Sequence, residues 1–260
     1  MSGTAPSSSP VRRVFFGPCR LRAGWRLAIF LALTALLEGA VRRIVVASHV
    51  KLPDGFAPGT LALAEGVSFL ITLAAVLVML RIERRTLADC GLPLRGALLP
   101  AFWVGLLWGL AAVAAIVVPV AALGGVRYSG LHYHGAELLR MTVLWWIAMI
   151  GIGLAEELMF RGYLLRTLAD GLGFWPASVL LSLLFGAMHF FLKPFETPVD
   201  FASVGLIGLF FCLTLRRTGD LWWAIGFHAG FDFAQLPLFA GPNSGNGGVP
   251  VAQALLVPHW

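Results

Sequence analysis

Charged residues are scarce in this chain of 260 residues. Asp, Glu, Lys and Arg make up 12% of it, against roughly a quarter in typical soluble domains. Hydrophobic residues account for 58%, and the mean hydropathy is +0.84. This shortage of charge argues against a soluble domain and predicts a polytopic membrane protein.

Cysteines and nucleophile motifs are also missing or few. The three cysteines, Cys19, Cys90 and Cys212, form neither a C-x-x-C pair nor a metal-ligand spacing, so we expect free thiols. No serine or cysteine accompanies the intramembrane histidines in a pattern such as G-x-S-x-G. The formal net charge of +6 is distributed between apolar stretches rather than clustered on one face, which argues against a nucleic-acid partner.

Three regions are predicted along the chain. Residues 1–24 form a Ser/Pro/Arg-rich tail without apolar periodicity, which we expect to be disordered and cytoplasmic. Residues 25–240 form a transmembrane helical domain. Residues 241–260 are a Gly/Pro-rich loop and an apolar segment too short to span, which would be a re-entrant piece or a truncated eighth helix.

Seven stretches are predicted to span, with about 20 residues needed for a spanning helix; the sixth is short. They are residues 25–47, 60–80, 97–123, 137–165, 174–192, 200–215 and 221–240. With the N-terminus inside, thirteen of the nineteen Lys and Arg residues lie in inner segments and six in outer ones. Because cytoplasmic loops collect basic residues, the sequence predicts an all-α bundle of seven to eight helices in the inner membrane of a bacterium, N-terminus inside.

Several ionisable side chains lie inside these spans, where each unpaired charge costs at least a few kcal/mol and usually marks a function. On the fourth, fifth and seventh spans they are Glu156, Glu157, Arg161, His189, His228 and Asp232. At 1.5 Å per residue, the three helices place these groups at similar depths. We therefore expect a polar site among helices four to seven. Glu65, near the outer end of the second span, is given no role.

Spacing within each helix separates the two glutamates. Glu157 and Arg161 are four residues apart, with the acid N-terminal to the base, which favours an ion pair on one helix face. Glu156 is rotated by about 100° from its neighbour, so its carboxylate remains available to the interior. His228 and Asp232 share a face by the same spacing.

This set of side chains limits the chemistry. A carboxylate and a histidine can hold and deprotonate a water, and the lack of a nucleophile motif favours direct attack by that water. Two histidines with carboxylates are also a suitable zinc set. A zinc ion therefore stays an open alternative, with ligands drawn from Glu156, His189, His228 and Asp232.

The motifs E-E-x-x-x-R ("EELMFR"), F-x-x-x-H ("FGAMH") and H-x-x-x-D/N ("HAGFD") resemble the CAAX prenyl protease type II and bacteriocin-processing (CPBP, Abi) family of intramembrane proteases. They extend from 156 to 232, inside a core of about 137–240. "GWR" at 24–26 and "RTLADCGLP" at 85–93 are similar to the family's upstream half. The resemblance implies an endopeptidase that hydrolyses a peptide bond of a membrane-associated peptide or protein.

The resemblance also implies roles. Glu156 corresponds to the catalytic glutamate and His189 to the histidine that shares the attacking water, with Glu157 and Arg161 in support. His228 and Asp232 fill the third motif, whose residues are expected to bind the oxyanion.

Asp232 occupies a position at which many family members have Asn. An ionised Asp cannot donate a hydrogen bond, so Asp232 must be protonated, orient His228 or ligate a metal. A non-enzymatic transporter or an immunity-type scaffold, using the same cluster to bind ions or partners, remains the alternative function.

Overall fold

The computed structural model describes residues 21–49, 57–97, 99–193, 196–241 and 253–259. Most of the predicted tail and of the Gly/Pro-rich loop lies outside these ranges. The described elements are almost all helical: α2 (Ala23–Ala47), α3 (Pro58–Glu83), η1 (Leu87–Cys90), η2 (Leu94–Gly96), α4 (Pro100–Ala122), β1 (Arg127–Leu131), α5 (Gly135–Glu157), η3 (Leu158–Leu164), α6 (Leu165–Leu172), α7 (Phe174–Leu192), α8 (Pro198–Thr218), α9 (Trp222–Phe233), η4 (Ala234–Leu238) and β2 (Leu256–His259).

Among the described residues, five helices are long and apolar enough to cross a membrane: Pro58–Glu83, Pro100–Ala122, Gly135–Leu172, Phe174–Leu192 and Pro198–Thr218. They coincide with five of the seven predicted spans. The 38-residue helix combines α5, η3 and α6. α8 extends further than predicted because Thr197 and Asp200 form a capping box around its start, with Pro198 in the first turn.

The other two predicted spans form helices but are not among these five. α2 covers the predicted range, yet it carries four charged residues, the buried Arg26 and the exposed Glu38, Arg42 and Arg43. α9 has only 12 residues and continues as the π-helical turn η4, which contains Pro237. Each of the seven predicted spans is thus helical in the part of the chain that the structure describes, and five of them are long and apolar enough to cross a membrane, which agrees with a bundle of seven to eight helices.

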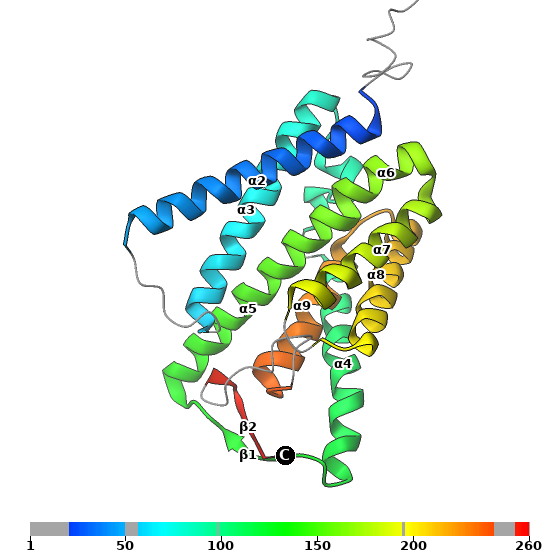
Figure 1. The fold of residues 1–260 in the computed structure, drawn as a ribbon. Helices are drawn as coiled ribbons and strands as arrows, with labels where there is room; N and C mark the ends of the chain where they lie inside the picture. The colour runs from blue at the N-terminus through cyan, green and yellow to red at the C-terminus, as the bar shows by residue number, and fades with distance from the viewer. Residues whose placement is uncertain (1–20, 50–56, 98, 194–195, 242–252, 260) are drawn as a thin grey trace, which may run out of the picture.

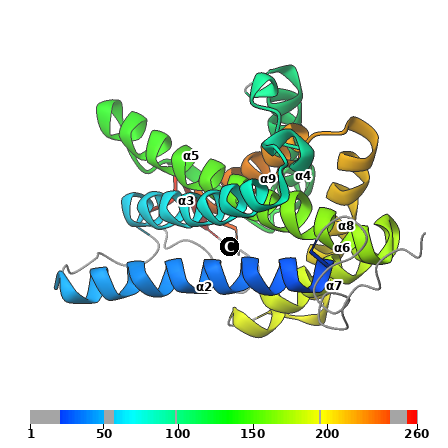
Figure 2. The same cartoon turned by 90° about the horizontal axis from the view of Figure 1, so that it is seen from above.

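The continuous helix α5–η3–α6 runs through the bundle (Figure 1). α3 and α9 both pack against α5, α4 packs against α9, and α7 pairs with α8. α2 lies along the outside, where it contacts α3 and α6 (Figure 2). The buried core includes Cys90 and Cys212, which are free thiols as predicted. Cys19 lies outside the described residues.

α4 and α9 approach each other through glycines on both helices. A Cβ added at Gly226 or Gly230 would overlap the carbonyl oxygen of Phe102 or Leu106 on α4. Added Cβ atoms at Gly105 and Gly109 would likewise overlap carbonyl oxygens of α9. This is the close small-residue packing that membrane helices use, and it fixes the depth and rotation of α9.

The end of the chain adopts a conformation that the sequence did not predict. β2 pairs antiparallel with β1, the segment between α4 and α5. The Trp145 indole donates to the carbonyl of Gln253 at 3.1 Å, and the Leu255 amide donates to that of Pro237 at 2.7 Å. The described part of this segment thus contains a strand, and not an eighth helix.

A short loop at the other end of the bundle joins α3 to α4 and touches the start of α9. The Leu221 amide donates to the Gly91 carbonyl at 2.7 Å, and the Trp222 indole donates to that of Pro93 at 3.0 Å. Within the loop, hydrogen bonds from the backbone and side chain of Thr86 hold the pKa of Asp89 below its usual range. The loop therefore anchors the N-terminal end of α9.

Candidate functional site

The ion pair predicted between Glu157 and Arg161 is present. Glu157 is the last residue of α5, and Arg161 lies in the π-helical segment η3 that follows. Arg161 Nη1 donates to Glu157 Oε1 at 3.0 Å, and the two side chains are 2% and 0% exposed. Both charged groups are buried, so each needs the opposite charge of the other to offset the cost of its desolvation.

Phe185 connects this pair to the second motif. Its ring centroid lies 4.3 Å from the Arg161 guanidinium carbon, a cation–π contact, and 4.6 Å from the centroid of the His189 imidazole. The carbonyl of Phe185 is 2.9 Å from His189 Nδ1. Phe185 thus stabilises Arg161 and orients His189, which explains why an aromatic residue precedes the histidine by four positions.

His228 is the centre of the polar cluster. Its Nδ1 lies 3.0 Å from Glu157 Oε1, so Glu157 accepts from both Arg161 and His228. On the other side of the ring, Nε2 lies 3.7 Å from Glu156 Oε2 and 3.5 Å from Asp232 Oδ2. Glu156 is the most accessible member, with 31% of its side chain exposed.

His189 joins this cluster less directly. Among the described residues, no hydrogen bond or ion pair joins it to Glu156, but it contacts Phe185 and interacts electrostatically with His228 and Asp232. If Nδ1 donates to the Phe185 carbonyl, Nε2 is the acceptor. The cluster therefore joins α5 and α9 through direct contacts, and His189 of α7 interacts electrostatically with His228 and Asp232.

Glu65 on α3 is an acid that the sequence analysis passed over. Its Cβ would lie 3.2 Å from a Cβ added at Gly151, so α3 and α5 are in close contact there. Glu65 also interacts electrostatically with Glu156 and Asp232. The sequence alone does not predict this interaction of Glu65 with the cluster, because it depends on the packing of α3 on α5. A glycine five residues before Glu156 was the available signal.

The zinc alternative does not fit this arrangement. Within the described ranges, no three His, Cys, Asp or Glu side chains are grouped so that they could hold a metal ion. His228 and His189 each direct Nδ1 at an acceptor, which leaves Nε2 as the ring nitrogen that could bind a metal. A catalytic zinc usually takes three protein ligands around one point, so we derive the chemistry of the cluster from its side chains alone.

Comparison with protein families gives one match. Residues 138–234 match the family described as type II CAAX prenyl endopeptidase Rce1-like. The matched segment runs from α5 to the start of η4 and contains all three motifs, so the resemblance recognised in the sequence is confirmed there. Comparisons with curated proteins and with solved structures find no significant match.

Proposed function

We propose that this chain, whose residues 138–234 match the Rce1-like type II CAAX prenyl endopeptidase family, is an intramembrane endopeptidase that cleaves a membrane-associated peptide or protein. The five apolar helices and the family match agree in indicating an integral membrane protease. The observation that carries the proposal is the cluster around His228, in which one imidazole contacts three carboxylates on two helices.

Glu156 is the general base in this proposal. It is the most exposed carboxylate of the cluster, and Glu157 already accepts two hydrogen bonds. A water bound by Glu156 would be polarised as it attacks the peptide carbonyl, and Glu156 would receive its proton and pass it to the leaving amine. His189, with Nε2 not engaged by the Phe185 carbonyl, is the second contact for this water.

His228 stabilises the oxyanion in the same scheme. An imidazolium held between Glu157 on Nδ1 and Asp232 near Nε2 is compensated by the adjacent negative charge. Its Nε2–H then donates to the oxygen on which charge develops, a contact that typically contributes a few kcal/mol. Asp232 has no need to donate itself, which accounts for Asp where many family members have Asn.

The matched family is described as a CAAX prenyl endopeptidase, so a prenylated peptide ending in a CAAX sequence is the first probe. A fluorogenic peptide of this type and its unprenylated counterpart should be incubated with the purified protein in detergent. Cleavage of the prenylated form alone would assign the lipid as a recognition element.

Glu156→Gln should lower kcat at least about 10²-fold, the range of a general base, without altering expression or the unfolding midpoint. Glu38→Gln, which changes an exposed acid on α2, is the matched control and should keep full activity. Equal cleavage by wild type and Glu156→Gln would exclude Glu156 as the base. The transporter alternative would be favoured by three results together. The wild-type protein would cleave neither probe, protein termini would be the same in a deletion strain and its parent, and the purified protein would transport an ion.

A further inference from the structure

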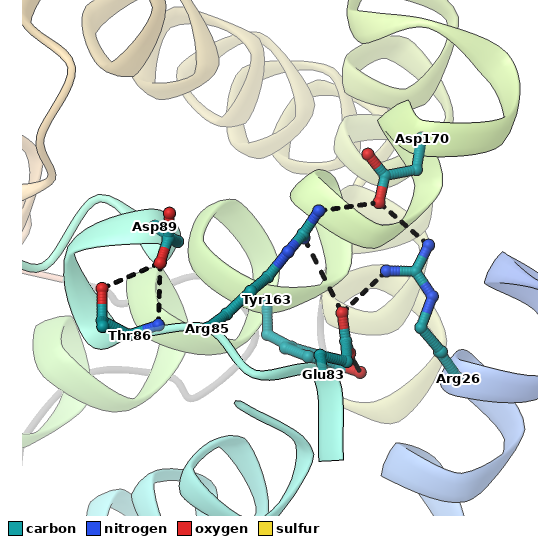
Figure 3. Close-up of polar contacts among 7 residues, drawn as sticks. All are labelled: Arg26, Glu83, Arg85, Thr86, Asp89, Tyr163 and Asp170. Carbon is teal, nitrogen blue, oxygen red and sulfur yellow. Dashed lines mark hydrogen bonds and ion pairs between the residues drawn. The ribbon is translucent and has the colours of Figure 1, made fainter. Parts of the chain in front are cut away.

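A second buried charge network lies at the loop end of the bundle, outside the cluster described above. Arg26 of α2 is 2% exposed and donates to Glu83 Oε2 at 2.8 Å and to Asp170 Oδ2 at 2.9 Å. Glu83 is itself 3% exposed and ends α3, whereas Asp170 belongs to α6. Figure 3 shows Arg26 between the two acids, with Arg85 also directed at both.

Tyr163 extends this network into the helix that carries the site. Its hydroxyl donates to Glu83 Oε1 at 2.6 Å, and its ring packs against Phe30 at 4.6 Å between centroids. Both oxygens of Glu83 are therefore engaged, one by Tyr163 and one by the two arginines. Tyr163 lies in η3, two residues after Arg161.

The π-helical conformation of η3 needs such support. A π-helical turn is rare and is found mostly at functional positions. η3 begins directly after Glu157, so any relaxation of η3 to an α-helix would rotate Arg161 relative to Glu157. The Glu157–Arg161 pair holds the first turn of the segment, and the Tyr163–Glu83 hydrogen bond holds its last turn.

We propose that Tyr163, Glu83 and Arg26 are positioning residues that hold η3 in the conformation presenting Glu157 and Arg161 to the site. The expected effect on kcat rests on the proposed function, whereas the expected effect on the conformation of η3 does not. Arg26 and Glu83 lie on α2 and α3, upstream of the family-matched segment, whereas Tyr163 lies within it. The two N-terminal helices thus supply part of the site's support.

Tyr163→Phe tests the proposal because it removes one hydroxyl and keeps the ring. We expect faster hydrogen exchange of the amides of 158–164, kcat lowered about tenfold and KM within twofold of wild type. Tyr128→Phe is the matched control: it removes a hydroxyl that donates to the Phe239 carbonyl at 3.0 Å, beside the strand pair. It should leave exchange in 158–164 and kcat unchanged.

Two double variants separate the effect of the Tyr163–Glu83 hydrogen bond from the effect of the charges of Arg26 and Glu83. Arg26→Met with Glu83→Gln removes both charges but keeps an acceptor for Tyr163, and should retain most of kcat. Arg26→Met with Glu83→Leu lacks the acceptor and should behave like Tyr163→Phe.

The proposal would be overturned if Tyr163→Phe left hydrogen exchange in 158–164 unchanged, or if it left kcat unchanged while the wild type is active. It would also be overturned if Tyr128→Phe changed exchange and kcat as much as Tyr163→Phe does. A wild type that cleaves no probe would count against the proposed function alone. Exchange would then still decide whether the network holds η3.

Discussion

Glu157 is the residue on which two parts of the site depend. Its Oε1 accepts from Arg161 and from His228, both at 3.0 Å, and its side chain is fully buried. Removing one partner of a buried pair commonly costs about 3 to 5 kcal/mol. We therefore expect Glu157→Gln to lower the unfolding midpoint in detergent, and to lower kcat further because His228 loses a charged partner.

Adding Arg161→Met to Glu157→Gln removes the unpaired charge. The double variant should regain part of the lost stability but not the lost activity, and a double-mutant cycle measures the coupling between the two positions. Strictly additive losses of stability would contradict the pairing. A Glu157→Gln protein that is stable and inactive, beside an active Glu156→Gln, would require the roles of the two acids to be exchanged.

At this scale the sequence predicts local relations well and distant ones poorly. The pair of Glu157 with Arg161 follows from a four-residue spacing on one helix. The contact of Glu157 with His228 joins residues 71 positions apart and depends on how α5 packs on α9. The π-helical turn carrying Arg161 likewise has no signal in composition or periodicity, because its support comes from Glu83 on another helix.

At the scale of elements, the position of α9 follows from the α4–α9 glycine contact. Gly226 precedes His228 by two residues, and any side chain there would meet the backbone of α4. We expect Gly226→Ala to force the helices apart, lowering the free energy of unfolding by about 1 to 3 kcal/mol, the usual cost of overpacking. Because α9 carries His228 and Asp232, kcat should fall as well.

Gly66→Ala on α3 is the control for this variant. A Cβ at Gly66 meets nothing within 4 Å, and Ala is favoured over Gly inside a helix by about 1 kcal/mol. Its unfolding midpoint should stay level or rise, and activity should be kept. Equal midpoints for Gly226→Ala and wild type would show that the α4–α9 contact tolerates a methyl group.

The sequence predicts the helices well where residues such as glycine mark their ends. α7 begins and ends at the predicted residues, and Gly173, with φ of 83°, separates it from α6. The seventh predicted span, 221–240, corresponds to α9 with η4, which together cover 222–238, but hydropathy does not reveal the π-helical turn that contains Pro237. The G-x-x-x-G spacings of 105–109 and 226–230 were present in the sequence and could have identified the tight helix pair.

For the whole molecule, the prediction of a membrane-embedded helical bundle succeeded because composition alone decides it. The strand pair at the C-terminal end was not foreseen. Its two strands come from segments more than 120 residues apart in the chain, and neither has a pattern that distinguishes it from a loop.

Orientation in the membrane can be tested on loops that the fold places together. The α3–α4 loop and the α8–α9 turn contact each other through Gly91 and Leu221, so they must lie on one side of the bilayer. The strand pair lies at the opposite end of the bundle (Figure 1). Because Arg84 and Arg85 lie in the first loop and Arg217 lies in the last turn of α8, we expect that side to be the cytoplasm.

Single cysteines at Arg95 and Arg217 in a cysteine-free background should then be shielded from a membrane-impermeant maleimide added to intact cells. A cysteine at Ser129 of β1, which is exposed within the strand pair, should react. Labelling of Arg95 and Arg217 without labelling of Ser129 would invert the orientation but keep the fold. Labelling of only one of the two loop positions would contradict the Gly91–Leu221 contact itself, since helices joined there cannot end on different sides of a membrane.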